Sequence, residues 1–173
     1  MPRSEAEESD EYVQLVSCGI YQTESELLVF DRESRPDKSD AFGRYALWKG
    51  THVELLDEQD CSLGLAQDAV LARLRDDLHL QTANLPIESK GLVWTPGEDR
   101  KQNQHLGIMF TIRIDNPSLR EHLEDKEFKS CGRRERSRLH LEPHDDLVAT
   151  ADELDLEPWS REVLEAKWLQ RIS

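Results

Sequence analysis

Apolar positions along this chain of 173 residues follow two spacings, one typical of strands and one typical of helices. Short apolar runs bounded by polar or turn-forming residues indicate strands. We expect such strands at residues 12–20, 27–30, 45–48, 91–94, 104–114 and 139–141. Glu24 and Ser25 fit a turn between the first two. The chain therefore combines predicted strands with the helical pattern described next.

One stretch has the spacing of an amphipathic helix. Ala66, Val70, Leu74 and Leu78 recur at steps of four, so they fall on one helical face. This pattern predicts a single helix over residues 65–78, with the last three of these side chains buried against a sheet.

Weaker signals predict the remaining turns and helices. Residues 49–54 are expected to form a tight turn in which Gly50 adopts a positive φ, a conformation that glycine tolerates. Ser160 is a suitable N-cap for a final helix. Helices are expected over residues 119–129, 147–154 and 159–172.

Composition and charge narrow the classes of partner. The net charge is −14, so nucleic acid polymers and anionic membranes would be repelled and are not expected as partners. A nucleotide is still possible, because a local cation can hold it. The chain has no long apolar run that would span a membrane and no apolar segment at its beginning.

Length and cysteine usage suggest how the chain is organised. The acidic residues 1–11 are expected to be a disordered tail, and residues 12–173 a single domain. Cys18, Cys61 and Cys131 are widely spaced and match neither a disulfide framework nor a zinc motif. A reducing cytoplasm is therefore the expected location.

The candidate chemistry lies between residues 43 and 80. Gly50-Thr51-His52-Val53 is followed by an acidic loop and by the predicted helix, which ends Ala72-Arg73-Leu74-Arg75-Asp76-Asp77-Leu78-His79-Leu80. This order resembles the Nudix box of the MutT-like hydrolases: Gly, five residues, Glu, seven residues, then Arg-Glu-apolar-x-Glu-Glu-x-Gly-apolar. The acid pair is present as Asp-Asp. Ala72, Arg73 and His79 stand where the family has Arg, the first Glu and Gly.

A second group of matches lies further along the chain. Gly91-Leu92-Val93, a polar turn and His105-Leu106-Gly107-Ile108 look similar to a bacterial branch of MutT-like predicted phosphoesterases. The resemblance implies the α/β fold class and a Nudix-like sandwich, in which a mixed β-sheet lies between the box helix and a C-terminal helix. It also implies hydrolysis of a nucleoside diphosphate-linked substrate with Mg²⁺ or Mn²⁺.

The resemblance assigns roles to particular residues. In Nudix chemistry, carboxylates hold divalent cations, which neutralise the pyrophosphate and activate water. The implied catalytic residues are Asp76, Asp77 and Glu98, and the implied metal ligands are Asp76, Asp77 and Asp57. Arg32, Arg35, His52 and His105 are the implied contacts to a nucleotide-type small molecule.

The changed box leaves alternatives open. Arg73 lies three and four residues before Asp76 and Asp77, a spacing that favours ion pairs within the helix and opposes a bound cation. The chain could therefore be a catalytically degenerate Nudix-fold module that binds a ligand, a protein partner or a second copy of itself. A small interaction protein without pocket chemistry is a third hypothesis. The basic residues 133–138 fit either a solvated loop or a phosphate contact.

Overall fold

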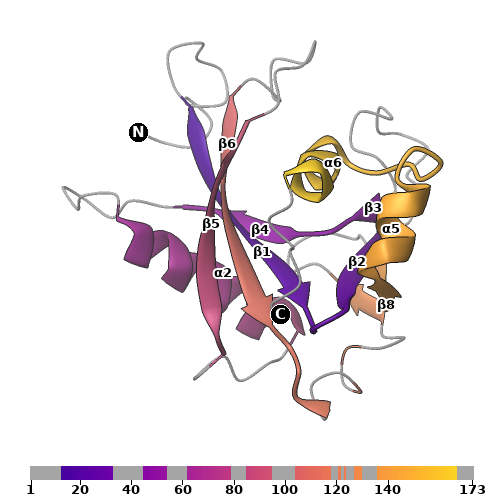
Figure 1. Cartoon of the computed structure of the whole chain (residues 1–173). Helices are drawn as coiled ribbons and strands as arrows, with labels where there is room; N and C mark the ends of the chain where they lie inside the picture. Colours follow the sequence, from indigo (N-terminus) through magenta and orange to yellow (C-terminus); the bar gives the residue numbers. More distant parts are fainter. Residues whose placement is uncertain are drawn as a thin grey trace.

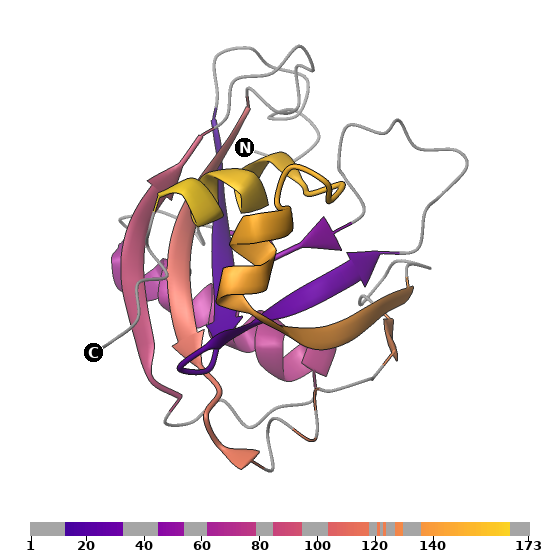
Figure 2. The ribbon, with the colours of Figure 1, turned by 45° about the vertical axis from the view of Figure 1, so that its right-hand side comes forward.

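The protein is built around a mixed β-sheet with helices on both faces, as Figures 1 and 2 show. The computed structural model describes residues 13–32, 45–53, 62–78, 85–94, 104–117, 121, 123, 127–129 and 136–166. The strands are β1 (Gln14–Gln22), β2 (Glu26–Arg32), β3 (Tyr45–Ala46), β4 (Lys49–His52), β5 (Ile87–Val93), β6 (His105–Arg113), β7 (Glu127–Lys129) and β8 (Arg136–Pro143). The helices are α2 (Leu63–Leu78), α5 (His144–Thr150) and α6 (Pro158–Glu165).

Strand β1 lies at the centre of the sheet. The main strand order is β5-β6-β1-β2-β8-β7, with β3 paired to β2 and β4 paired to β1. β1 runs parallel to β6, from the pair Gln14 and His105 to the pair Gln22 and Arg113. It runs antiparallel to β4 and to β2. The sheet is therefore mixed, as the sequence predicted.

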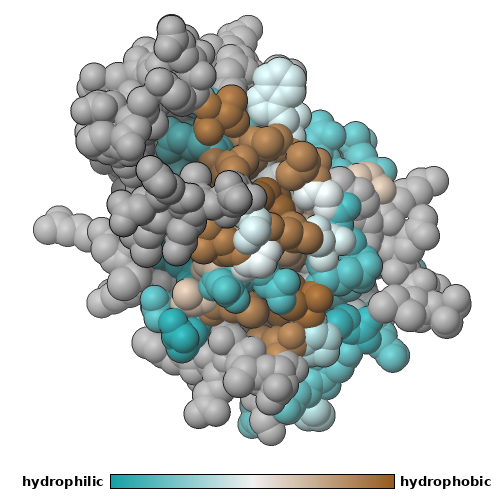
Figure 3. All heavy atoms as spheres, turned by 90° about the vertical axis from the view of Figure 1, so that its left-hand side faces the viewer, coloured by the Kyte–Doolittle hydropathy of each residue, from teal (hydrophilic) through white to brown (hydrophobic). Residues whose placement is uncertain are grey.

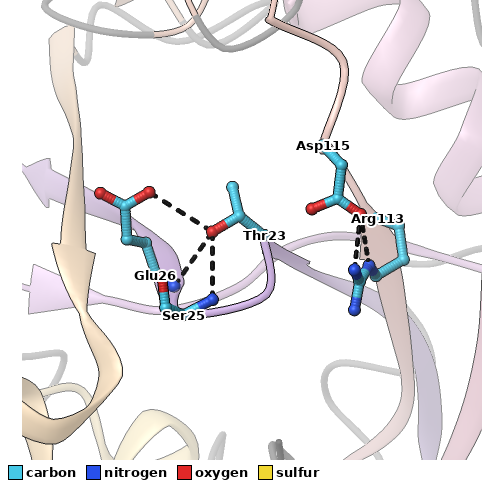
Figure 4. A network of polar contacts seen from close by, with 5 residues as sticks. All are labelled: Thr23, Ser25, Glu26, Arg113 and Asp115. Atoms are coloured by element: carbon cyan, nitrogen blue, oxygen red, sulfur yellow. Dashed lines mark hydrogen bonds and ion pairs between the residues drawn. The ribbon is translucent and has the colours of Figure 1, made fainter. Parts of the chain in front are cut away.

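A side-chain hydrogen bond closes the turn between β1 and β2 (Figure 4). The Thr23 hydroxyl oxygen accepts the backbone N–H of Glu26 at 3.0 Å, and the hydroxyl donates to the Glu26 carboxylate at 3.3 Å. Threonine in this position closes turns because its hydroxyl reaches the backbone two or three residues on. The predicted turn at Glu24 and Ser25 is confirmed.

Each face of the sheet carries its own apolar core. On the α2 face the buried cluster is Tyr21, Leu28, Phe30, Ala46, Ala66, Val70, Leu74, Ile108, Phe110, Ile112, Ile114, Leu123 and Leu139. On the α5 and α6 face it is Val16, Cys18, Ile20, Leu27, Val29, Leu47, Val93, Met109, Leu147, Leu156, Trp159, Val163 and Leu164. Figure 2 shows α5 and α6 in front of the sheet and α2 behind it. The predicted sandwich between the box helix and a C-terminal helix is confirmed.

The box helix forms nearly where the apolar spacing predicts it. α2 begins at Leu63, two residues before the predicted start, because the Ser62 hydroxyl accepts the Leu65 N–H at 3.1 Å and caps the first turn. Val70 and Leu74 are buried, as expected. The side chain of Leu78 lies outside the described residues.

The expected turn around Gly50 is wrong. Residues 49–52 form strand β4, which pairs with β1 through Cys18 opposite Gly50. There is no space for a side chain at Gly50, since a Cβ at this position would lie 2.6 Å from the Ser17 carbonyl oxygen. The same short apolar and polar pattern fits a turn or an edge strand, and pairing with β1 decided between them.

The C-terminal predictions also need correction. Ser160 does not cap the final helix. Glu157 does, and its carboxylate accepts the N–H groups of Trp159 and Ser160. Pro158 follows at the first helical position, which suits its fixed φ. Residues 127–129, expected within a helix, pair with β8 as strand β7. α5 spans His144–Thr150 rather than 147–154, and α6 is described only as far as Glu165.

Candidate functional site

Two predicted site residues, His52 and His105, meet at the end of the sheet where β1 and β6 begin. β4 and β6 flank β1 on opposite edges, with His52 opposite Val16 and His105 opposite Gln14. The two Nε2 atoms lie 3.3 Å apart, and the rings meet edge to face with centroids 5.4 Å apart. The structure therefore forms a histidine pair from positions 53 residues apart in sequence.

Two buried glutamines lie next to His105, Gln14 aligned with it on β1 and Gln104 just before it in the chain. Gln14 is 9% exposed and Gln104 is 5% exposed, and the Gln14 N–H donates to the Gln104 carbonyl oxygen at 2.6 Å. The side-chain Nε2 of Gln14 is buried with no hydrogen-bond partner among the described residues. Sequence reasoning missed both glutamines, because glutamine at a strand end carries no pattern that distinguishes a buried amide from a solvated one.

The histidine pair lies on the face of the sheet that α6 covers. The Ser17 hydroxyl donates to the Ala66 carbonyl oxygen of α2 at 2.5 Å, so Ser17 faces α2. Side chains alternate along a strand, which turns Val16 to the other face, and aligned residues of paired strands share a face. His52 is aligned with Val16, and so belongs to the α6 side.

The acidic end of α2 lies at the other end of β1. Ala66 contacts Ser17, and Val70 approaches Gly19, so the helix runs in the same direction as the strand. Asp76 follows Ala66 by ten positions of helix, about 15 Å along the axis. Asp76 is 62% exposed, and its Oδ1 lies 3.6 Å from Nε of Arg75. The structure therefore does not bring Asp76 together with His52 and His105.

The other predicted residues are only partly placed by the structure. Asp77 lies in the last turn of α2 and Arg32 at the end of β2, but their side chains lie outside the described residues. Arg35, Asp57 and Glu98 lie outside them altogether, as do residues 133–135 of the basic cluster. Their roles stay predictions.

The described end of α2 does not by itself fit a divalent cation. Arg73 is half-buried where the family pattern has a carboxylate, and Asp76 faces solvent beside Arg75. Among the residues that the structure describes, no three His, Cys, Asp or Glu side chains gather as they would around a metal ion. A cation here would depend on the side chains of Asp77 and Asp57.

A buried carboxylate organises another part of the α6 face. Glu157 is 5% exposed, and it accepts the indole N–H of Trp48 at 2.6 Å and the hydroxyl of Ser160 at 3.0 Å. Ser160 in turn accepts the backbone N–H of Leu47 at 2.9 Å. This network ties the start of α6 to the segment between β3 and β4. Burial, and then the charge of Glu157, raise the pKa of the nearby Cys18 thiol well above its ordinary value.

Solved structures show what fold this is. The chain is similar to Tm1382, a proposed Nudix hydrolase, with a TM-score of 0.60 at 16% identity over 97% of this chain and 77% of that one. It is similar to a mutT/nudix family protein from Listeria innocua, with a TM-score of 0.58 at 17% identity over 89% of this chain and 90% of that one. It is also similar to DR0079 from Deinococcus radiodurans, with a TM-score of 0.58 at 14% identity over 88% of this chain and 82% of that one. The chain has a Nudix-like fold.

These likenesses are structural. No protein-family model matches the sequence, and no curated protein matches it either. None of the described helices is long and apolar enough to cross a membrane. The Nudix-like fold confirms the architecture that the box resemblance implied, while the changed residues of α2 bear on the activity.

Proposed function

We propose that the chain is a divergent Nudix-type hydrolase of low turnover that acts on a nucleoside diphosphate-linked compound. The observation that supports the proposal is the Nudix-like fold, together with the packing of α2, the helix with the box-like residues, against β1 and β4. Mg²⁺ or Mn²⁺ would supply charge neutralisation of the pyrophosphate when bound. Asp76, Asp77, Asp57 and Glu98 are the carboxylates proposed for this chemistry.

Low turnover follows from the residues of α2. Arg73 places a fixed positive charge where a cation would need a carboxylate. The carboxylate of Asp76 points into solvent, where its interaction with any ligand is weakened by water. Arg32 and Arg35 remain the proposed contacts to the phosphates of the substrate, since guanidinium groups bind phosphate oxygens in pairs.

A second candidate is a Nudix-fold module that binds its ligand or a protein without turnover. Ligand binding without turnover is favoured by Asp76, because its carboxylate faces solvent. Binding of a protein partner or a second copy is favoured by the edge strand β5, where Leu92 is 59% exposed, and by Trp94 just after it, which is 53% exposed. Figure 3 shows apolar side chains grouped near the middle of one face, with hydrophilic ones to the right of them and below.

One pair of measurements separates these candidates. The purified protein is titrated calorimetrically with a panel of nucleoside diphosphate derivatives in the presence of Mg²⁺ or Mn²⁺, and the same mixtures are followed for release of nucleoside monophosphate. Binding with slow release supports the hydrolase, and binding with none supports the binding module. If no member of the panel binds or is cleaved, both proposals for a nucleotide ligand are wrong.

A further inference from the structure

The histidine pair brings two imidazole nitrogens close together. His52 and His105 come from different strands, on either side of β1, and their Nε2 atoms lie 3.3 Å apart. Both side chains are half-buried, so a small ion can still approach them. Imidazole is the nitrogen ligand that zinc, nickel, cobalt and copper ions share.

The spacing of the two nitrogens matches a metal site. Two imidazole nitrogens bound tetrahedrally to one Zn²⁺ ion, each about 2.0–2.1 Å from it, are about 3.3–3.4 Å apart. We propose that His52 and His105 bind one transition-metal ion of the zinc class through their Nε2 atoms.

The other coordination positions are not assigned to any side chain that the structure describes. In the part of the chain that the structure describes, no third His, Cys, Asp or Glu side chain joins the pair. Two protein ligands are one fewer than the three of catalytic zinc sites, so water or oxygens of an anion would complete the coordination of the ion. Gln14 is aligned with His105 on the same face, and its buried Nε2 lacks an acceptor among the described residues. An oxygen ligand on the metal would supply one.

This site is distinct from the acidic end of α2. The histidine pair offers nitrogen ligands on the α6 face, near the start of β1, whereas Asp76 lies on the α2 side, towards the other end of that strand. Mg²⁺ prefers oxygen ligands in an octahedron, so it is not the ion expected at the pair. The proposal therefore stands or fails independently of the proposed function.

Cobalt serves as the spectroscopic probe. Tag-free protein is titrated with Co²⁺ and then with Zn²⁺ in competition. We expect one ion per chain, with visible bands of tetrahedral Co²⁺ and no intense near-ultraviolet band from thiolate ligation. His52→Gln and His105→Gln should each weaken binding at least about tenfold. The matched control is His140→Gln, a β8 histidine whose Nε2 lies 3.4 Å from a Glu142 oxygen, and it should bind as the wild type does.

A second readout uses the wild type alone, so it does not depend on folding of the variants. Ring-nitrogen NMR spectra recorded with and without Zn²⁺ should show two Nε2 signals moving together at one equivalent. If no Nε2 signal moves, or if the folded variants of His52 and His105 bind as tightly as the control, the pair is a hydrogen-bonded contact only and the proposal is wrong. A cobalt spectrum with thiolate bands would also overturn it.

Discussion

Gly50 shows how a single residue can be required by a neighbour rather than by its own backbone conformation. Its ideal Cβ would lie 2.6 Å from the Ser17 carbonyl oxygen and 3.0 Å from Trp48 Cζ3. A backbone oxygen in a paired strand cannot move aside easily. Gly50→Ala should therefore destabilise the protein by about 1–3 kcal/mol, measured as the free energy of unfolding in urea.

The matched control for this prediction is Gly64→Ala in α2. There the nearest atom to an added Cβ is Ser62 Oγ at 3.7 Å, an ordinary contact. Alanine in a helix is favoured over glycine, so this variant should be neutral or stabilised by up to about 1 kcal/mol. Equal effects of the two variants would show that close approach to β1 is not what requires Gly50.

Glu157 is the second residue whose surroundings decide its role. Its carboxylate accepts the Trp48 indole N–H, the Ser160 hydroxyl and two backbone N–H groups. Glu157→Ala would leave these buried donors without an acceptor, and should cost about 2–3 kcal/mol in urea unfolding. Glu165→Ala, at an exposed position of the same helix, should change stability by less than about 0.5 kcal/mol. A loss of similar size in both would contradict the network.

At the scale of the element, α2 is held to the sheet by one apolar stripe. Leu74 is 1% exposed and packs in the α2 core, whereas the adjacent Arg75 side chain is 62% exposed. Leu74→Ala should cost about 2–5 kcal/mol, because it leaves a cavity that neighbours fill only in part. Arg75→Ala is the control and should stay within about 0.5 kcal/mol. Thermal and urea unfolding of both variants would show whether the stripe is core.

The same helix allows a test of the box itself. Arg73→Glu changes the local charge by two units and places a carboxylate one turn before Asp77. Combined with Ala72→Arg, it restores two residues of the family pattern. We expect the double variant to bind Mg²⁺ or Mn²⁺ more tightly than wild type in calorimetric titrations at one pH and salt. If the folded variant binds no better, the alignment of residues 72–77 with the Nudix box is wrong.

At the scale of the whole molecule, the free energy of unfolding should decrease at alkaline pH because of Cys18. Burial and the charge of Glu157 raise the pKa of this thiol in the folded state, so it keeps its proton where the unfolded thiol, with a pKa of about 8.5, has lost it. Unfolding then releases a proton. The contribution of Cys18 is constant below about pH 8.5, and stability falls as the pH rises above it.

The measurement compares wild type with Cys18→Ala under reducing conditions between about pH 7 and 10. Alanine removes the titrating thiol, and its packing loss does not depend on pH. The wild type should lose stability relative to the variant at a slope approaching about 1.4 kcal/mol per pH unit. Parallel stability curves across this range would show that burial of Cys18 has no such effect.

The sequence by itself determined the elements that local pattern controls. The four-residue spacing of Ala66, Val70 and Leu74 places α2, since a helix must bury one stripe. The apolar runs place β1, β2 and β6 to within two residues, and the motif order around Gly50 and Asp76 leads to the Nudix-like fold. These features are local because each depends on residues close together in the chain.

Tertiary structure decided the rest, because pairing partners lie far away in the sequence. Contact with β1 turned residues 49–52 into a strand, and burial made Glu157 rather than Ser160 the cap of α6. The register of β4 and β6 on β1 brought His52 and His105 together. The direction of α2 along β1 placed Asp76 at the far end of that strand from them. No spacing along the chain encodes these distances, since they arise only when the strands assemble side by side.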